Sequence, residues 1–218
     1  MNPFNDFSNY QELLRSMSYK DIAQFCRTNS QFRNICNSAR GKEIIAEVLE
    51  RSIEKILNNL PLDLLQILDR NLWDTINNRP SKLGTTERIQ QLIDEYYNTQ
   101  TEVAIEILRK KNYSRQFYRD LYQYFKNSPH ARVHRTRPIY QKETGYTPLI
   151  NELLTYLNQY GYTYPGPLII ELIQERDPTV DMSQYQKEVD QTFLRRHPEL
   201  LEFFGSINYD DYIDDDVE

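Results

Sequence analysis

The sequence predicts an all-α protein, an irregular multi-helix domain with a small helical module at one end and a smaller helical subdomain towards the other. Apolar residues recur at helical spacing along almost all of the 218 residues, and the long strict alternation that marks strands is missing. Glycine is scarce, at 6 residues, which leaves few positions for the Gly-rich phosphate loops of nucleotide-binding folds. A chain of this length buries a substantial core without disulfides.

Residues 1–58 are expected to form the first module from three short helices and one longer helix. Ser18 and Asp21 make a capping-box pattern that opens the second helix, and Pro61 ends the fourth. The helices are predicted over Tyr10–Ser16, Ser18–Arg27, Ser30–Asn37 and about Gly41–Asn58.

The range 59–128 is predicted to form a helical body, followed by a basic loop. Its helices are expected over Leu62–Arg70, Leu72–Asn77, Thr86 to about Asn98, Val103–Leu108 and Ser114–Lys126. Residues 129–146 lack apolar periodicity, contain two prolines and are rich in Arg and His. This basic loop is therefore predicted to be a linker and a domain boundary.

The range 147–207 is predicted to form a C-terminal helical subdomain. Thr147 followed by Pro148 is an N-cap with a first-turn proline, which opens a helix to about Tyr160. Further helices are expected over Met182–Arg196 and Pro198–Phe204. Residues 208–218, the acidic tail, hold six acidic residues among eleven and are expected to be solvated and mobile.

Composition and the first residues predict a soluble intracellular protein. No apolar run approaches the ~18 residues that a membrane span needs, and the first residues have neither a basic start nor an apolar core typical of a secretory signal. We therefore expect a protein that is neither secreted nor bound to membranes. Cys26 and Cys36 are most simply interpreted as free thiols in a reducing compartment.

No residue pattern indicates an enzyme, a metal site or a cofactor. His130 and His134 have no Cys or carboxylate beside them, and the two cysteines are ten residues apart. Both cysteines have apolar neighbours, which is typical of buried residues and not of reactive thiolates. We expect a non-enzymatic protein with no catalytic residue, no metal and no cofactor.

The charges are segregated along the chain. Met1–Leu108 has 12 basic and 15 acidic residues, Arg109–Lys142 has 10 basic and 1 acidic, and residues 143–218 have 4 basic and 16 acidic. The central segment is also rich in Tyr and Phe. Cations neutralise phosphates and aromatic rings stack on bases, so this composition is compatible with nucleic-acid contact.

A basic contact surface is therefore predicted on the central segment. Its residues are Arg109, Lys110, Lys111, Arg115, Tyr118, Arg119, Lys126, Arg132, Arg135 and Arg137. Three interpretations stay open: contact with an acidic protein or with the chain's own acidic half, which we favour, contact with nucleic acid, or a simply solvated face.

One short motif resembles a known family. Residues 21–36 carry an Ile-x-x-Phe-Cys helix, a Thr-Asn pair and then Phe-Arg-x-Ile-Cys. This pattern resembles the F-box-like domains of proteins of large DNA viruses, over roughly Tyr10–Leu49. The resemblance implies a three-helix module that docks on the adaptor subunit of a cullin-RING ubiquitin ligase. It implies a docking face of Leu13, Leu14, Met17 and Ile22, although Ser16-Met17-Ser18 stands where such modules open with Leu-Pro.

Two functions remain open at this point. The protein is expected to be a viral protein–protein interaction protein that acts as a ubiquitin-ligase substrate adaptor. Alternatively, it is a structural or minor capsid component of a virus particle that uses its basic segment to bind partner proteins or nucleic acid. Its expected location is the host cytoplasm or the virus particle.

Overall fold

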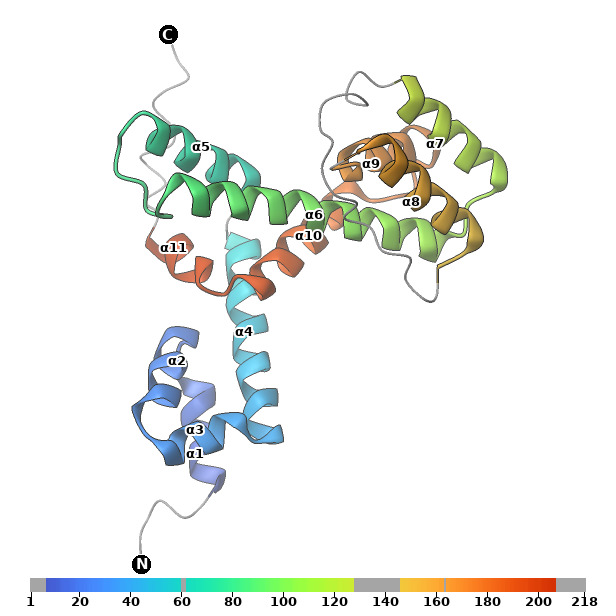
Figure 1. Cartoon of the computed structure of the whole chain (residues 1–218). Helices are drawn as coiled ribbons and strands as arrows, with labels where there is room; N and C mark the ends of the chain where they lie inside the picture. The colour runs from blue at the N-terminus through green and yellow to red at the C-terminus, as the bar shows by residue number, and fades with distance from the viewer. Residues whose placement is uncertain (1–6, 60–61, 128–145, 163, 207–218) are drawn as a thin grey trace, which may run out of the picture. The chain divides into compact units, whose positions relative to one another are not determined.

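The computed structural model describes residues 7–59, 62–127, 146–162 and 164–206 (Figure 1). Over these ranges the chain forms eleven helices and no strand, so the all-α prediction is confirmed. The helices are α1 (Phe7–Ser16), α2 (Tyr19–Thr28), α3 (Ser30–Asn37), α4 (Ala39–Asn59), α5 (Leu64–Ile76), α6 (Thr86–Lys111), α7 (Arg115–Asn127), α8 (Pro148–Tyr160), α9 (Gly166–Arg176), α10 (Met182–Arg196) and α11 (Leu200–Ser206). None of these helices is both long and apolar enough to cross a membrane.

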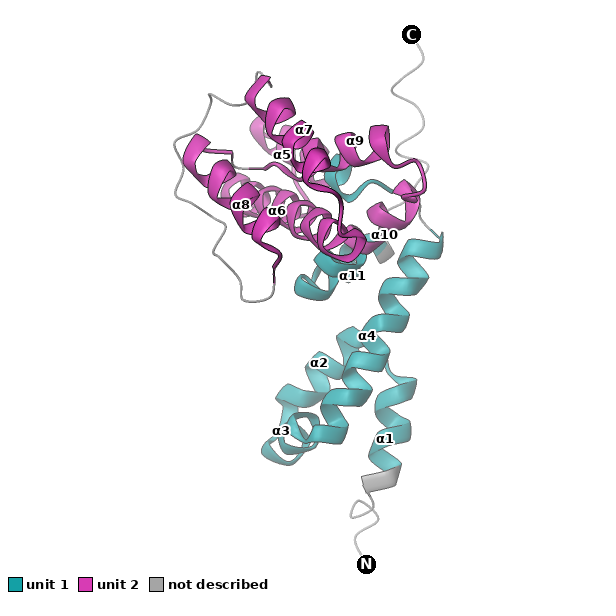
Figure 2. Cartoon of the chain, turned by 90° about the vertical axis from the view of Figure 1, so that its right-hand side faces the viewer, with its two compact units in different colours: residues 1–67, 191–218 teal, residues 68–190 magenta. Residues whose placement is uncertain are grey.

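The chain divides into two compact units (Figure 2). Unit 1 comprises residues 1–67 and 191–218, and unit 2 comprises residues 68–190. This division differs from the expected one, because α8 and α9 belong to the same unit as α6 and α7 instead of forming a separate subdomain. The expected basic loop lies almost wholly outside the described residues, and the acidic tail lies wholly outside them.

Side chains from α1 to α4 form a core in unit 1. Its buried members are Tyr10, Leu14, Ile22, Ile35, Ile44 and Val48. Phe25 and Phe32 pack against this core half-buried, with their ring centroids 4.1 Å apart. The spacing of these residues along each short helix places one apolar face of α2 and one of α3 toward α4.

Side-chain caps fix several helix starts where the sequence predicts them. The Ser18 hydroxyl oxygen accepts a hydrogen bond from the Asp21 backbone N–H at 3.2 Å and so caps α2. Asn29 caps α3 by accepting from the Phe32 N–H at 2.9 Å. Thr147 caps α8 with Pro148 in its first turn. These caps satisfy backbone donors that would otherwise lack partners at the helix start.

The longest helix of unit 2, α6, is continuous where the sequence predicts two shorter helices. Thr99 and Thr101 interrupt the apolar pattern, yet both are buried. Their hydroxyls donate to the carbonyls of Glu95 and Tyr97, four residues earlier, at 2.9 and 3.0 Å. Because each hydroxyl finds its partner within the helix, these polar side chains are buried without breaking it.

The helices α6 and α9 meet at Gly166 within unit 2. A Cβ atom on Gly166 would lie 2.6 Å from the backbone nitrogen of Thr101. The Gly166 N–H donates to the Thr101 hydroxyl at 3.1 Å. Only glycine permits two helix backbones to approach this closely.

Candidate functional site

Three cations of the predicted basic surface are paired with acidic residues of unit 2. Arg109 lies 2.8 Å from Glu106, Lys110 lies 3.7 Å from Glu188, and Lys111 lies 3.5 Å from Asp177. Two of these partners come from the strongly acidic range 143–218. The interpretation that part of the basic segment contacts the chain's own acidic half is supported for these residues.

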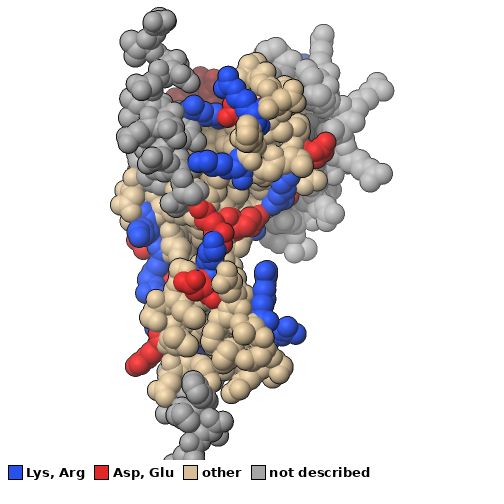
Figure 3. Space-filling model, turned by 90° about the vertical axis from the view of Figure 1, so that its left-hand side faces the viewer, with Lys and Arg blue, Asp and Glu red and all other residues tan. Residues whose placement is uncertain are grey.

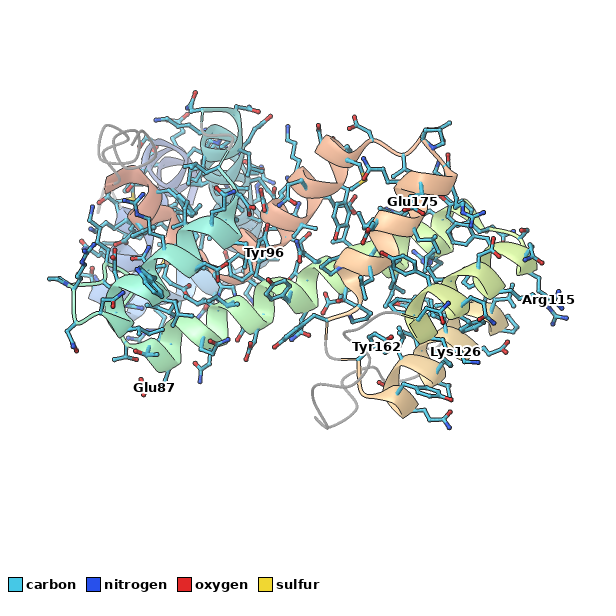
Figure 4. The ribbon with its side chains drawn as sticks, turned by 90° about the horizontal axis from the view of Figure 1, so that it is seen from above. Glu87, Tyr96, Arg115, Lys126, Tyr162 and Glu175 are labelled. Atoms are coloured by element: carbon cyan, nitrogen blue, oxygen red, sulfur yellow. A yellow bond between two sulfur atoms is a disulfide. The ribbon has the colours of Figure 1, made fainter. Side chains whose placement is uncertain are left out.

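Three further cations lie on α7 and are exposed. Arg115, Arg119 and Lys126 form no ion pair with any carboxylate that the structure describes. Arg115 extends outward from the start of α7 (Figure 4). The remaining predicted members, Arg132, Arg135 and Arg137, lie outside the described residues. Within the described part of unit 2, the basic contact surface is therefore reduced to α7.

Three aromatic residues of this segment, Phe117, Tyr118 and Phe125, are buried inside unit 2 and so are not available to stack on bases. Tyr113, Tyr122 and Tyr124 are half-buried, and Tyr140 lies outside the described residues. Tyr118 is 2% exposed, and its assignment to the basic contact surface is wrong. It belongs to the buried stripe of α7 together with Phe117, Leu121 and Phe125. Burial raises the pKa of the Tyr118 hydroxyl to about 12.

Tyr113, at the start of the same segment, is bound by its neighbours. Its ring stacks on Phe117 with centroids 4.1 Å apart, and its hydroxyl donates to Asp177 at 2.8 Å. Asp177 also accepts from the Thr179 hydroxyl, and the hydrogen bonds from Thr179 and Tyr113 lower the pKa of the Asp177 carboxyl to about 2. This carboxylate therefore has a structural role in holding α6 and α9 of unit 2.

The docking face implied by the F-box-like resemblance is mostly buried. Leu14 is 1% exposed and Ile22 is 2% exposed, because both belong to the core of unit 1. Neither side chain can contact a partner in this fold, so their assignment as docking residues is wrong. Leu13 is 40% exposed and Met17 is half-buried. Only these two of the four residues remain accessible.

Cys26 and Cys36 form a disulfide, so the prediction of free thiols is wrong. The single residue Asn29 separates α2 from α3, and the two helices pack against each other. This hairpin brings the ends of both helices together, with the two Cα atoms 5.9 Å apart. The inference of a reducing compartment depended on free thiols and loses its basis.

A groove of about 520 Å³ lies within unit 1, between the start of α2, the second half of α4 and α11. From α4 it is lined by Ser52, Lys55, Ile56 and Asn59, which recur at the i, i+3, i+4, i+7 spacing of one helix face. From α11 and the short connection before it come Pro198, Leu201, Glu202 and Phe204. The groove thus combines apolar side chains with polar and charged ones.

Two interactions position the walls of this groove. The Ser18 cap fixes the first turn of α2, which presents Tyr19 and Lys20 to the groove. Arg195, near the end of α10, lies 2.5 Å from Glu50 of α4. α11 follows α10 after three residues, so this exposed ion pair lies close to the point where α11 packs beside α4.

The charges at the groove are unequally paired. Lys20 lies 3.5 Å from Glu202 across the groove, and both side chains are more than half exposed. Lys55 has no carboxylate partner among the described residues. Burial and the nearby charge of Glu199 raise the pKa of the Tyr19 hydroxyl, so Tyr19 stays neutral near pH 7. The groove therefore offers one uncompensated cation beside apolar side chains.

No sequence pattern predicts that the residues lining this groove from α4 and α11 form a site. In the sequence, Ile56 is part of the helical apolar stripe expected over Gly41–Asn58. The one available signal is that Ile56 is the single apolar member of an otherwise polar face of α4. A polar face with one apolar residue is common on solvated helices, so this signal is weak.

Within the part of the chain that the structure describes, no group of three or more His, Cys, Asp or Glu side chains could hold a metal ion. His130 and His134 lie outside that part. Comparison with protein-family models, with curated proteins and with solved structures finds no match to this chain.

Proposed function

We propose that the chain is a non-enzymatic interaction protein that binds a short segment of a partner protein in the groove of unit 1. The groove between α2, α4 and α11 carries this proposal. Its volume of about 520 Å³ is within the range of sites that enclose a few side chains. Side chains from α2, α4 and α11 line the groove, and α11 belongs to the second chain segment of unit 1, residues 191–218.

The chemistry of the groove suggests the chemistry of the partner segment. Ile56, Leu201 and Phe204 provide apolar contacts, which favour large apolar side chains in the partner. Lys55 lacks a carboxylate partner among the described residues, and Lys20 is held only by an exposed pair with Glu202. A segment with apolar side chains between acidic residues complements both features.

The test uses three sets of short fluorescent peptides, with apolar residues placed between acidic, basic or neutral polar residues. We expect the apolar-acidic peptides to bind and to shift the backbone amide NMR signals of Lys55, Ile56 and Leu201. Lys55→Glu should weaken binding of these peptides by about tenfold, because the attraction between Lys55 and their acidic residues is replaced by repulsion between like charges.

Lys42→Glu is the matched control, because Lys42 is also an exposed lysine of α4 but does not line the groove. It should leave the affinity unchanged. If no peptide of any set shifts the groove signals, or if both lysine variants weaken binding equally, the groove is not the binding site.

A second candidate follows from the F-box-like resemblance, and the accessibility of Leu13 favours it. Leu13 is 40% exposed on α1, four residues before half-buried Met17. In this candidate, unit 1 docks on the ubiquitin-ligase adaptor through these two side chains. Co-purification of the adaptor with the intact chain, and its loss on Leu13→Asp, is the expected result. Failure of the intact chain to recover the adaptor would remove this candidate.

A further inference from the structure

The acidic tail, Asn208–Glu218, has the chemistry that the groove of unit 1 favours. Six of its eleven residues are acidic. Tyr209 precedes these acids, and Tyr212, Ile213 and Val217 lie between them. This is the pattern of apolar side chains among carboxylates that complements Ile56, Leu201 and Lys55.

The tail is also attached at the edge of the groove. Phe204 of α11 lines the groove, and the tail begins four residues later. Ile213 comes nine residues after Phe204, and nine extended residues span up to about 30 Å. The connection is therefore long enough for the tail to turn back into the groove.

We propose that the acidic tail occupies the groove of its own chain and competes there with the partner segment. The proposal rests on the proposed function, since it assigns a regulator to the same binding site. Apolar side chains of the tail lie against Ile56, Leu201 and Phe204, and its carboxylates face Lys55 and Lys20 at the rim.

Attachment makes even a weak contact effective. A short flexible connection gives the tail an effective concentration on the order of 1 mM at the groove. A tail that binds as a separate peptide with a dissociation constant of about 100 µM would lower the apparent affinity of a competing partner about tenfold. The tail therefore sets how much partner is needed to occupy the groove.

The experiment compares full-length variants by NMR and by peptide binding. In the tail variant, Asp210, Asp211, Asp214 and Asp215 are changed to Asn, which keeps the size of each side chain and removes its charge. We expect this variant to bind the apolar-acidic peptides about tenfold more tightly than the unchanged chain. Lys55→Glu should shift and sharpen the amide signals of the tail, and Lys42→Glu should leave them unchanged.

The outcomes separate the two proposals. If the peptides bind the unchanged chain and the tail variant equally, and Lys55→Glu leaves the tail signals unchanged, the tail does not occupy the groove although the groove still binds a partner. If no peptide shifts the groove signals even in the tail variant, the proposed function itself fails. If the tail signals of the unchanged chain depend on protein concentration, the tail enters the groove of a second copy, which overturns occupancy within one chain.

Discussion

Breaking the disulfide between Cys26 and Cys36 is expected to destabilise unit 1 by about 3 kcal/mol. The bond joins positions ten residues apart. Closing a loop of that length removes about 9 cal/mol/K of entropy from the unfolded chain, which is about 3 kcal/mol at 25 °C. Cys26→Ala removes the disulfide more cleanly than Cys36→Ala, because Cys36 is only 5% exposed and truncating its side chain would also leave a cavity.

The assay is urea unfolding followed by hydrogen exchange of individual amides, with and without reductant. The single tryptophan, Trp73, is 64% exposed and lies in unit 2, so its fluorescence does not report on the core of unit 1. We expect the midpoint for the amides of α2 and α3 to fall by about 1.5 M urea. The amides of α6, in unit 2, are the internal control and should keep their midpoint.

Two results would refute this reasoning. Labelling of both cysteines by a thiol reagent in the unreduced protein would show that the bond is not formed. An unchanged midpoint on reduction would show that the bond adds nothing to stability, either because the unfolded chain is already restricted there or because the folded hairpin is strained.

Three further changes probe unit 2. Gly166→Ala should lower the free energy of unfolding of unit 2 by about 3 kcal/mol, since the new Cβ would displace the α6 backbone. A loss below about 0.5 kcal/mol would show that α6 and α9 are not in close contact. The pKa of the Asp177 carboxyl is lowered from 3.8 to about 2, so its contribution to the stability of unit 2 is present above pH ~4 and is lost as the pH falls towards 2. Asp177→Asn should therefore make the free energy of unfolding depend less steeply on pH over that range. An unchanged slope would contradict this role of Asp177. Arg115→Glu with Arg119→Glu should weaken any binding of single-stranded DNA or RNA at low salt. The slope of the logarithm of the binding constant against the logarithm of salt concentration should become shallower by about 1.4. An unchanged affinity would exclude α7 as a nucleic-acid surface.

Local features of the fold could be predicted from the sequence because short-range chemistry determines them. The Ser18 and Thr147 caps lie where their patterns place them. The continuous helix α6 could not be predicted, because burial of Thr99 and Thr101 depends on packing by other helices. Without that packing, two threonines in an apolar pattern favour a break.

Longer-range features escaped prediction for a related reason. Tyr118 shares a helix face with the cations Arg115 and Arg119 in the sequence pattern, but it is next to Phe117 on the side that unit 2 buries. The spacing of residues along a helix gives their angular positions around its axis, but it does not give the width of the face that becomes buried. Tyr118 lies at the edge of the buried face of α7. The same limit applies to Leu14, whose position beside exposed Leu13 does not reveal which of the two is buried.

The groove of unit 1 depends on residues far apart in the chain. Leu201 and Phe204 reach Ile56 only because the chain after residue 190 returns to unit 1. The ion pair between Arg195 and Glu50 joins positions 145 residues apart, and no local pattern marks either partner. Contacts at such separations follow from the whole fold, so sequence periodicity could not place them.

Among the described residues, part of the charge that is segregated along the sequence is paired in the fold. On the face shown in Figure 3, basic and acidic side chains lie among one another. Within unit 2, Lys110 and Lys111 of the basic segment pair with Glu188 and Asp177, and Asp120 pairs with Arg176 at 3.4 Å. Exposed pairs of this kind add little to stability, about 0–1 kcal/mol each, but they neutralise the local field.

Several cations have no carboxylate partner among the described residues, and two sets of them lie on the candidate surfaces. In unit 2 the set is Arg115, Arg119 and Lys126 on α7, and at the groove of unit 1 it is Lys55. Exposed Lys42, Lys82 and Lys187 also lack a carboxylate partner there, but they line neither surface. A cation without a carboxylate nearby attracts an anionic group at a lower desolvation cost than a cation that must first leave a partner. The two sites differ in their surroundings, because Lys55 lies beside Ile56 and Leu201 whereas the aromatic neighbours of the α7 cations are buried or half-buried. An acidic segment with apolar side chains should thus discriminate between them in favour of the groove, while a purely polyanionic ligand should prefer α7.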